Sequence, residues 1–240
     1  MEKKYVLITG ASGGIGAAIS RRLVADGYTL YLHYHENRHK IEVLQEELGT
    51  DRVIAVQANL SLQEGVEQLW RQIHHEVEAI IYTAGKSVYG LVTDVTNEQL
   101  EQMTHLQITS LYKLMNAALP PMIRRRRGNI IVISSVWGEV GASCEVLYSM
   151  LKGAQNTYVK ALAKEVALSG IRVNAIAPGA IDTEMLHIFS EEEKQELAED
   201  IPLGRLGMPE EVANTASFLL SEQASYITGQ ILNVNGGWYS

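Results

Sequence analysis

The chain has 240 residues, 46% of them hydrophobic, which is enough to bury a large core within one domain. The formal net charge of -8 argues against a nucleic-acid partner, because binding to a phosphate backbone needs a basic surface. The only cysteine, Cys144, excludes an intrachain disulfide and a metal site made of several thiolates.

The beginning of the chain carries no long apolar segment. Met1 to Lys4 lead directly into a short apolar run, Tyr5–Thr9. This run is too short for the apolar part of a signal peptide or for a membrane span. We therefore expect a cytoplasmic protein without a membrane partner.

Short apolar runs alternate with longer segments of helical periodicity. The expected strands are Tyr5–Thr9, Thr29–Tyr34, Val53–Gln57, Ala79–Tyr82, Asn129–Ser134, Arg172–Ala177 and Ile231–Val234. The expected helices are Gly14–Ala25, Lys40–Leu48, Leu62–His75, Asn97–Ile123, Leu147–Ser169 and Pro209–Leu220. This rhythm predicts parallel strands with helices on both faces of the sheet. No Pro-rich or Gly-rich linker divides residues 1–240, so we expect a single doubly wound α/β domain of about seven strands.

A glycine-rich turn lies between the first expected strand and the first expected helix. It reads Thr9-Gly10-Ala11-Ser12-Gly13-Gly14-Ile15-Gly16. Glycines in such a turn let backbone N–H groups approach a pyrophosphate, and the helix N-terminus adds partial positive charge. A merely structural turn is the alternative, but the strand before it and the helix after it favour dinucleotide binding.

The end of the second expected strand bears on the choice between NAD and NADP. An acidic residue there accepts hydrogen bonds from the ribose of NAD and repels the additional phosphate of NADP. The expected position falls on Tyr34, which is not acidic, and Arg38 and Lys40 follow closely. We therefore expect NADPH, with NADH as the alternative if the register differs by two residues and Glu36 takes that position.

Two segments are unusually charged. The run Arg124 to Arg127 ends an expected helix, where cations suit the helix dipole, so we interpret it as a helix end rather than a phosphate-binding patch. Residues 182–206 break the alternation of strands and helices, and Ser190 followed by Glu191 to Glu193 predicts a helix start. The position of this stretch after a strand end predicts a lid over a site, or a solvated surface helix.

Tyr148 and Lys152 are four residues apart in the expected helix Leu147–Ser169, so they share one face. A phenol with a free pKa of about 10 is a poor acid at neutral pH, and a nearby ammonium lowers that pKa. The pair therefore predicts a tunable proton donor and acceptor. The spacing alone is common in helices, so its weight depends on the other motifs.

In combination these motifs resemble those of the short-chain dehydrogenase/reductase family, over essentially the whole chain. The resemblance rests on Thr9–Gly16, Ser135 thirteen residues before Tyr148, Tyr148 with Lys152, and the segments Asn174–Gly179, Ile201–Arg205, Ile227–Gln230 and Asn235–Gly237. The chain looks most like the 3-oxoacyl-[acyl-carrier-protein] reductase branch, which reduces ketones with NADPH. The resemblance implies a Rossmann fold.

The resemblance also implies a role for each site residue. Tyr148 would give its proton to the carbonyl oxygen while hydride arrives from the nicotinamide, and Lys152 would depress the tyrosine pKa and bind the nicotinamide ribose. Ser135 would hydrogen-bond the substrate oxygen, although a strand-end turn serine, as its neighbour Ser134 suggests, is the alternative. The cofactor site would comprise Gly10, Ser12, Gly13, Gly14, Ile15, Gly16, Tyr34, Arg38, Asn59, Leu60, Ala84, Gly85, Pro178, Gly179, Ile181 and Thr183.

The chain departs from the family pattern at two positions. Thr83 stands where the family has an asparagine whose amide braces neighbouring strands, so a hydroxyl remains and the amide is lost. Gln107 stands at the family's catalytic asparagine, which is thought to hold a water that links the lysine to solvent. Glutamine carries the same amide on a longer arm, so Gln107 either keeps the relay or is only a polar position on a packed helix.

Assembly and substrate follow from the same resemblance. The family packs two long helices across subunits, so we expect a homodimer or homotetramer, with Trp238 and Tyr239 buried at another subunit interface. The expected substrate is a 3-oxoacyl thioester on acyl carrier protein. The alternatives are a ketone on another protein, such as the 5-aminopentanone on elongation factor P, and an inactive dinucleotide-binding sensor. No metal is expected, because none of the seven histidines joins a carboxylate or thiol cluster.

Overall fold

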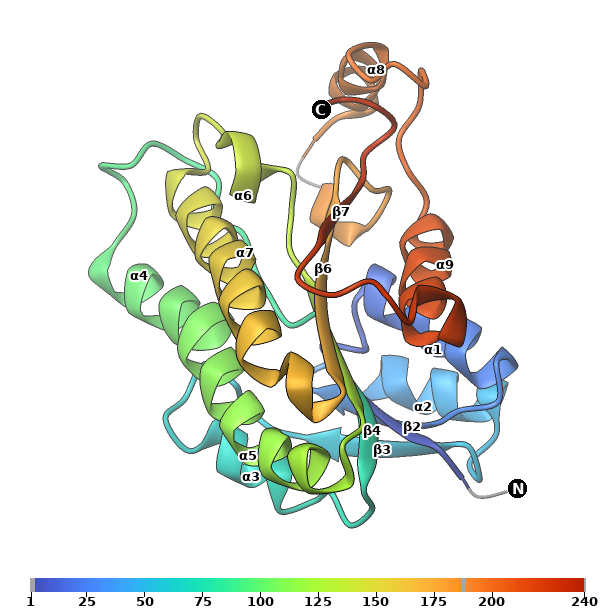
Figure 1. The fold of residues 1–240 in the computed structure, drawn as a ribbon. Coiled ribbons are helices and arrows are strands. Elements are labelled where there is room, and N and C mark those ends of the chain that lie inside the picture. Colours follow the sequence, from blue (N-terminus) through green and yellow to red (C-terminus); the bar gives the residue numbers. More distant parts are fainter. Residues whose placement is uncertain (1–2, 187–188, 240) are drawn as a thin grey trace.

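The computed structural model describes residues 3–186 and 189–239. Within these residues, seven parallel strands form one sheet in the order β3-β2-β1-β4-β5-β6-β7 (Figure 1). The strands are β1 (Tyr5–Thr9), β2 (Thr29–Tyr34), β3 (Val53–Gln57), β4 (Val77–Tyr82), β5 (Gly128–Ile133), β6 (Ile171–Pro178) and β7 (Ile231–Val234). The expected α/β class, with its doubly wound parallel sheet, is confirmed.

Helices cover both faces of this sheet, because each parallel connection must cross over it. They are α1 (Gly14–Ala25), α2 (Arg38–Leu48), α3 (Gly65–Trp70), α4 (Asn97–Thr104), α5 (Ser110–Arg125), α6 (Trp137–Val140), α7 (Val146–Val166), α8 (Glu191–Glu199) and α9 (Pro209–Leu220). Short turns complete them: the π turn η1 (His105–Thr109) and the 3-10 turns η2 (Ala167–Ser169), η3 (Glu184–Leu186) and η4 (Glu222–Ala224). Figure 1 shows α3, α5 and α7 on one side of the sheet and α1, α2 and α9 on the other.

Alternation along each strand divides the core into two apolar clusters. In β1, Leu7 belongs to the cluster under α3, α5 and α7, while Val6 and Ile8 belong to the cluster under α1, α2 and α9. All three side chains are fully buried. This burial on both faces explains why the strands read as continuous apolar runs in the sequence.

Two expected helices are interrupted in the structure. Helix α3 covers only part of the expected segment Leu62–His75, because the chain first turns tightly after β3. A Cβ on Gly65 would lie 2.0 Å from the carbonyl oxygen of Asn59, so only glycine permits this approach. The expected helix Asn97–Ile123 contains the π turn η1, which separates α4 from α5.

The arginine run ends a helix, as its sequence predicts. Helix α5 ends at Arg125, and Arg126 adopts a left-handed conformation with φ of 53°. Arg125 lies 3.5 Å from the carboxylate of Glu76, and Arg127 lies 3.4 Å from that of Glu78. These partners tie the end of α5 to strand β4 and the residue before it.

The sheet order brings the carboxyl ends of β1 and β4 together at the point where the chain reverses direction across the sheet. Ligands bind in the crevice at such a point in open α/β sheets. Within residues 3–186 and 189–239, none of the helices has the length and apolar character that crossing a membrane requires.

Candidate active site

A cavity of about 1160 Å³ opens at this crevice. It collects residues from the loops after β1, β2, β3, β4, β5 and β6, and from the start of α7. Most of the expected site residues line it: Gly10, Ser12, Gly13, Gly14, Ile15, Gly16, Asn59, Leu60, Ala84, Gly85, Ser135, Tyr148, Lys152, Pro178, Gly179, Ile181 and Thr183. Three expected residues lie outside it: Tyr34, Arg38 and Gln107.

The glycine turn fits the pyrophosphate of a dinucleotide. Helix α1 begins after Gly13, and no side chain caps its first N–H groups, so these donors face the cavity. Gly10 has a φ of +65°, and a Cβ there would lie 3.0 Å from the backbone of Ala84. A Cβ on Gly16 would lie 2.5 Å from the Gly10 carbonyl oxygen. The turn, the helix and strand β4 therefore meet more closely than any larger residue would permit.

His33 supports this turn from below, a role that the sequence did not suggest. Its Nδ1 accepts from the Gly10 N–H at 3.1 Å, and its Nε2 lies 3.1 Å from the Ala58 carbonyl oxygen. Burial lowers the pKa of His33 to about 4, so the ring is neutral at physiological pH. The proton therefore stays on Nε2, which donates to Ala58.

The residues facing the cavity at the end of β2 are His35, Glu36 and Asn37. Tyr34 instead packs among the apolar residues under α1, because neighbouring strand residues point to opposite faces. Arg38 is exposed and donates from Nε to Glu42 at 2.8 Å. The expectation that Tyr34 and Arg38 contact the cofactor is thus not supported by this geometry, and Glu36 takes the position beside the cavity.

Thr83 joins neighbouring strands although it lacks the amide of the family's asparagine. Its hydroxyl donates to the carbonyl oxygen of Thr9, and its N–H donates to the Thr9 hydroxyl at 3.1 Å. The Thr9 hydroxyl also accepts from the Ala84 N–H at 3.2 Å. These bonds join the carboxyl ends of β1 and β4, so two threonines replace the missing amide.

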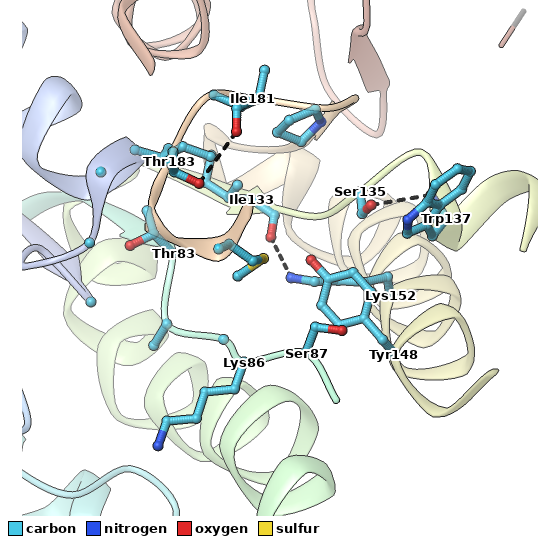
Figure 2. A pocket seen from close by; sticks show the side chains of 18 of the residues that line it. Thr83, Lys86, Ser87, Ile133, Ser135, Trp137, Tyr148, Lys152, Ile181 and Thr183 are labelled. Atoms are coloured by element: carbon cyan, nitrogen blue, oxygen red, sulfur yellow. Dashed lines mark hydrogen bonds between the residues drawn. The ribbon is translucent and has the colours of Figure 1, made fainter. Parts of the chain in front are cut away.

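Ser135, Tyr148 and Lys152 surround one end of the cavity (Figure 2). All three are buried, and the Lys152 ammonium lies 5.4 Å from the centre of the Tyr148 ring. Helix α6 holds Ser135 close to α7, because Gly138 lets the two backbones touch: a Cβ there would lie 2.7 Å from the Lys152 carbonyl carbon. The neighbouring Ser134 also lines the cavity, but its hydroxyl donates to the Lys152 carbonyl oxygen at 3.4 Å.

Burial is the largest influence on the pKa values of Tyr148 and Lys152. It raises the pKa of Tyr148 well above its ordinary value; the Glu145 carboxylate adds to the rise, and a hydrogen bond with Ser135 opposes it. Burial also lowers the pKa of Lys152 to about 7. The pKa of Tyr148 is thus raised by burial, opposite to the expected depression by Lys152, and the phenol keeps its proton at neutral pH.

Gln107 is fully buried in the π turn η1 and does not reach the cavity. Its Nε2 donates to the Lys86 carbonyl oxygen at 3.0 Å, and its Oε1 has no hydrogen-bond partner in the described part of the chain. Its backbone carbonyl accepts from the Gln155 side chain at 2.8 Å. Gln155 is a second residue that sequence reasoning missed, although its position three residues after Lys152 was visible.

A carboxylate and aromatic rings line the same end of the cavity as Ser135 and Tyr148, and the Trp137 backbone N–H donates to the Ser135 hydroxyl at 3.2 Å (Figure 2). Glu145 lines this end and accepts a hydrogen bond from the Ser87 hydroxyl. The ring of Trp137 packs against Trp238 and Tyr239, with ring centres 4.9 Å and 5.4 Å apart. Trp238 and Tyr239 line the cavity of their own chain, and the expected subunit interface for them stays a prediction. Glu145 was also missed, although it precedes Tyr148 by three residues.

Residues of the expected lid also line the cavity, among them Met185, Phe189 and Leu197. Helix α8 begins with the predicted cap: Ser190 accepts from the Glu193 N–H at 3.2 Å, and Glu193 accepts from the Ser190 N–H at 2.8 Å. In the described part of the chain, no three His, Cys, Asp or Glu side chains gather as metal ligands would.

Comparison with known proteins agrees with this geometry. A model from the short-chain dehydrogenase/reductase group, described as Enoyl-(Acyl carrier protein) reductase, matches residues 10–239. The chain is 54% identical to the uncharacterized oxidoreductase YmfI of Bacillus subtilis, over 98% of this chain and 99% of that protein. It is 37% identical to the 3-oxoacyl-[acyl-carrier-protein] reductase FabG of Aquifex aeolicus, over 100% of this chain and 98% of that protein.

A solved structure extends the likeness to three dimensions. The 3-oxoacyl-[acyl-carrier protein] reductase of Brucella melitensis superposes with a TM-score of 0.92 and 30% identity. The alignment covers 100% of this chain and 92% of that one. Family model, relatives and fold therefore agree, and the chain belongs to the short-chain dehydrogenase/reductase family of oxidoreductases, which use a nicotinamide dinucleotide.

Proposed function

We propose that this chain is an NADPH-dependent carbonyl reductase that converts a ketone into a secondary alcohol. The observation that carries the proposal is the convergence of Ser135, Tyr148 and Lys152 at one end of a cavity whose other wall is the glycine turn. The bound cofactor supplies hydride to the carbonyl carbon. Ser135 and Tyr148 donate hydrogen bonds to the carbonyl oxygen, which gains negative charge as the carbon is reduced.

Tyr148 then transfers its proton to that oxygen, and the Lys152 ammonium stabilises the phenolate that remains. The raised pKa of Tyr148 keeps the phenol protonated until the substrate oxygen acquires charge. The lowered pKa of Lys152, about 7, lets the ammonium give up a proton and regain one near neutral pH. The pair therefore returns to its starting state after each turnover.

NADPH is the proposed reductant. Arg38 and Lys40 lie in the first turn of α2, directly after the loop that borders the cavity. In the chain alone they pair with Glu42 and Glu184, so both side chains would leave these carboxylates to offer positive charge to an additional phosphate. Glu36 opposes this choice, but its side chain is 75% exposed, where water screens its charge. Measuring KM for NADPH and for NADH will show whether the basic residues or Glu36 determine the choice of cofactor.

A 3-oxoacyl thioester on acyl carrier protein is one candidate substrate. The relatives from Aquifex aeolicus and Staphylococcus aureus, at 37% and 34% identity, are named for that reaction. The cavity is large enough for a ketone on a flexible carrier arm. We propose that residues 182–206 act as a lid, which would open for such an arm.

The substrate end of the cavity favours a second candidate, a ketone that carries an amino group and is attached to a protein. The 5-aminopentanone on elongation factor P has this chemistry. An ammonium would pair with the Glu145 carboxylate and lie against the rings of Trp137 and Trp238, whereas a neutral acyl chain gains nothing from a carboxylate.

The test compares carrier-bound 3-oxoacyl groups with a protein-bound amino ketone, each with NADPH oxidation as the readout. Wild type is expected to oxidise NADPH with a ketone, and Tyr148→Phe to lose this activity while still binding NADPH. Glu145→Gln is expected to lower kcat/KM at least tenfold for the amino ketone only. Turnover in Tyr148→Phe would refute the mechanism. Tight NADPH binding by wild type without turnover of any ketone would instead support a dinucleotide-binding sensor.

We further propose that the protein acts in the cytoplasm as a homodimer or homotetramer. Helices α5 and α7 carry exposed apolar side chains, including Tyr112, Ile123 and Met150, which a second copy would cover. Light scattering of wild type and Met150→Asp will test this, since a monomeric wild type contradicts it.

A further inference from the structure

The side-chain amide of Gln155 lies between the Lys152 ammonium and the π turn η1. Gln155 is fully buried on α7. Its Oε1 accepts from Lys152 Nζ at 3.1 Å, and its Nε2 donates to the Gln107 carbonyl oxygen at 2.8 Å. Both ends of the amide are used, so only one orientation satisfies it.

Two acceptors in the described part of the chain hold the Lys152 ammonium: Gln155 Oε1 and the Ile133 carbonyl oxygen, at 3.1 Å and 2.8 Å. Figure 2 shows the bond to Ile133 beside the Tyr148 ring. An ammonium has three N–H groups, so the third stays available on the cavity side. Each acceptor favours the charged form and thus opposes the effect of burial.

The Gln107 side chain donates to the Lys86 carbonyl oxygen. Its backbone carbonyl is linked to Lys152 through Gln155. The Gln107 Oε1 has no partner in the described residues; a Cβ on Gly85 would lie 3.2 Å from this oxygen and 3.6 Å from Lys152 Nζ. The linking group is an amide, which orients its partners. The rare π turn presents that carbonyl to α7.

We propose that Gln155 is a positioning residue for the reaction proposed above, on which this inference rests. Its amide ties Lys152 to the π turn and keeps the ammonium charged beside Tyr148.

Lysine titration by NMR tests this without any turnover. Protein carrying 13C-labelled lysine is titrated in the absence of cofactor, and Lys152→Met assigns the Lys152 signal. Gln155→Met keeps the side-chain length but removes the acceptor, so the Lys152 pKa is expected to fall by about one unit or more. Gln155→Glu adds a negative partner, so the pKa is expected to rise by a similar amount. The matched control is Asn156→Leu, because this buried neighbour has no hydrogen-bond partner in the described residues.

The pH dependence of kcat supplies a second readout. A fall of one unit from about 7 reduces the charged fraction of Lys152 at pH 7 from about one half to one tenth, so Gln155→Met is expected to lose about fivefold in kcat at that pH. The loss should disappear towards lower pH. A Lys152 titration that is unchanged in both Gln155 variants overturns the inference. A wild type that reduces no ketone refutes the proposed function. The NMR titration needs no turnover, so it tests the role of Gln155 independently.

Discussion

Burial of the Lys152 ammonium lowers the free energy of unfolding, and a variant without the amine should lack this effect. The pKa of Lys152 is lowered from 10.5 to about 7 by burial, so the folded protein binds one proton fewer than the unfolded chain between these values. The free energy of unfolding therefore rises with pH across that window, by about 1.4 kcal/mol per unit. Below pH 7 the full penalty applies, about 5 kcal/mol relative to high pH.

The variant Lys152→Met lacks this contribution. Its methionine leaves the Ile133 and Gln155 acceptors unpaired, which is a constant cost at every pH. The pH dependence is therefore the informative quantity. We expect the stability of wild type relative to Lys152→Met to rise by about 3 kcal/mol between pH 7 and pH 9.5, because the window spans about 2.5 units.

Urea unfolding of both proteins at half-unit pH steps measures this difference. Lys160→Met serves as the control, since Lys160 is exposed on the same helix and should give a flat difference. A flat difference for Lys152→Met as well would refute the reasoning. It would mean that the ammonium is stabilised by its two acceptors as well as it is by water.

Three further predictions concern the cofactor and the packing of the site. Arg38→Ala should raise KM for NADPH at least fivefold without changing KM for NADH, and Glu36→Gln should lower KM for NADPH; equal effects on both cofactors would contradict this. Thr83→Val should lower the free energy of unfolding by about 1–3 kcal/mol, because the buried Thr9 carbonyl oxygen loses its hydrogen bond from the Thr83 hydroxyl. Thr83→Ser retains a hydroxyl and should retain most of the wild-type stability. An equal loss of stability in both variants would contradict the role of this hydrogen bond. Gly138→Ala should lower stability by about 1–3 kcal/mol, because a methyl group there meets the backbone of α7, and an unchanged midpoint in urea would show that α6 can move aside.

Local patterns in the sequence predicted most of the fold. Strands β1, β2, β3 and β7 and helices α1 and α9 have the predicted bounds. Each of these elements is either a continuous apolar run or a segment with helical periodicity, and both signals come from neighbouring residues. The π turn η1 was not predicted, because it depends on α7, far along the chain.

The composition of the site could be predicted where residue type and spacing carry the chemistry. The glycine turn and the pair Tyr148 and Lys152 line one cavity, as their motifs suggested. The direction of Tyr34 could not be predicted, because a single residue of strand register turns a side chain from the crevice to the core. The cavity-lining position of Glu145 depends on the placement of the loop that carries Ser87.

The sequence by itself determined the class of the fold and the placement of Tyr148 and Lys152 on one face of a helix, since these follow from periodicity and from spacing along the chain. The tertiary structure alone decided how that lysine is held, where Trp238 and Tyr239 lie, and how His33 supports the glycine turn. These contacts join residues that are distant in sequence or lie in different elements. Burial then sets the titration of Tyr148 and Lys152, and burial is a property of the whole fold.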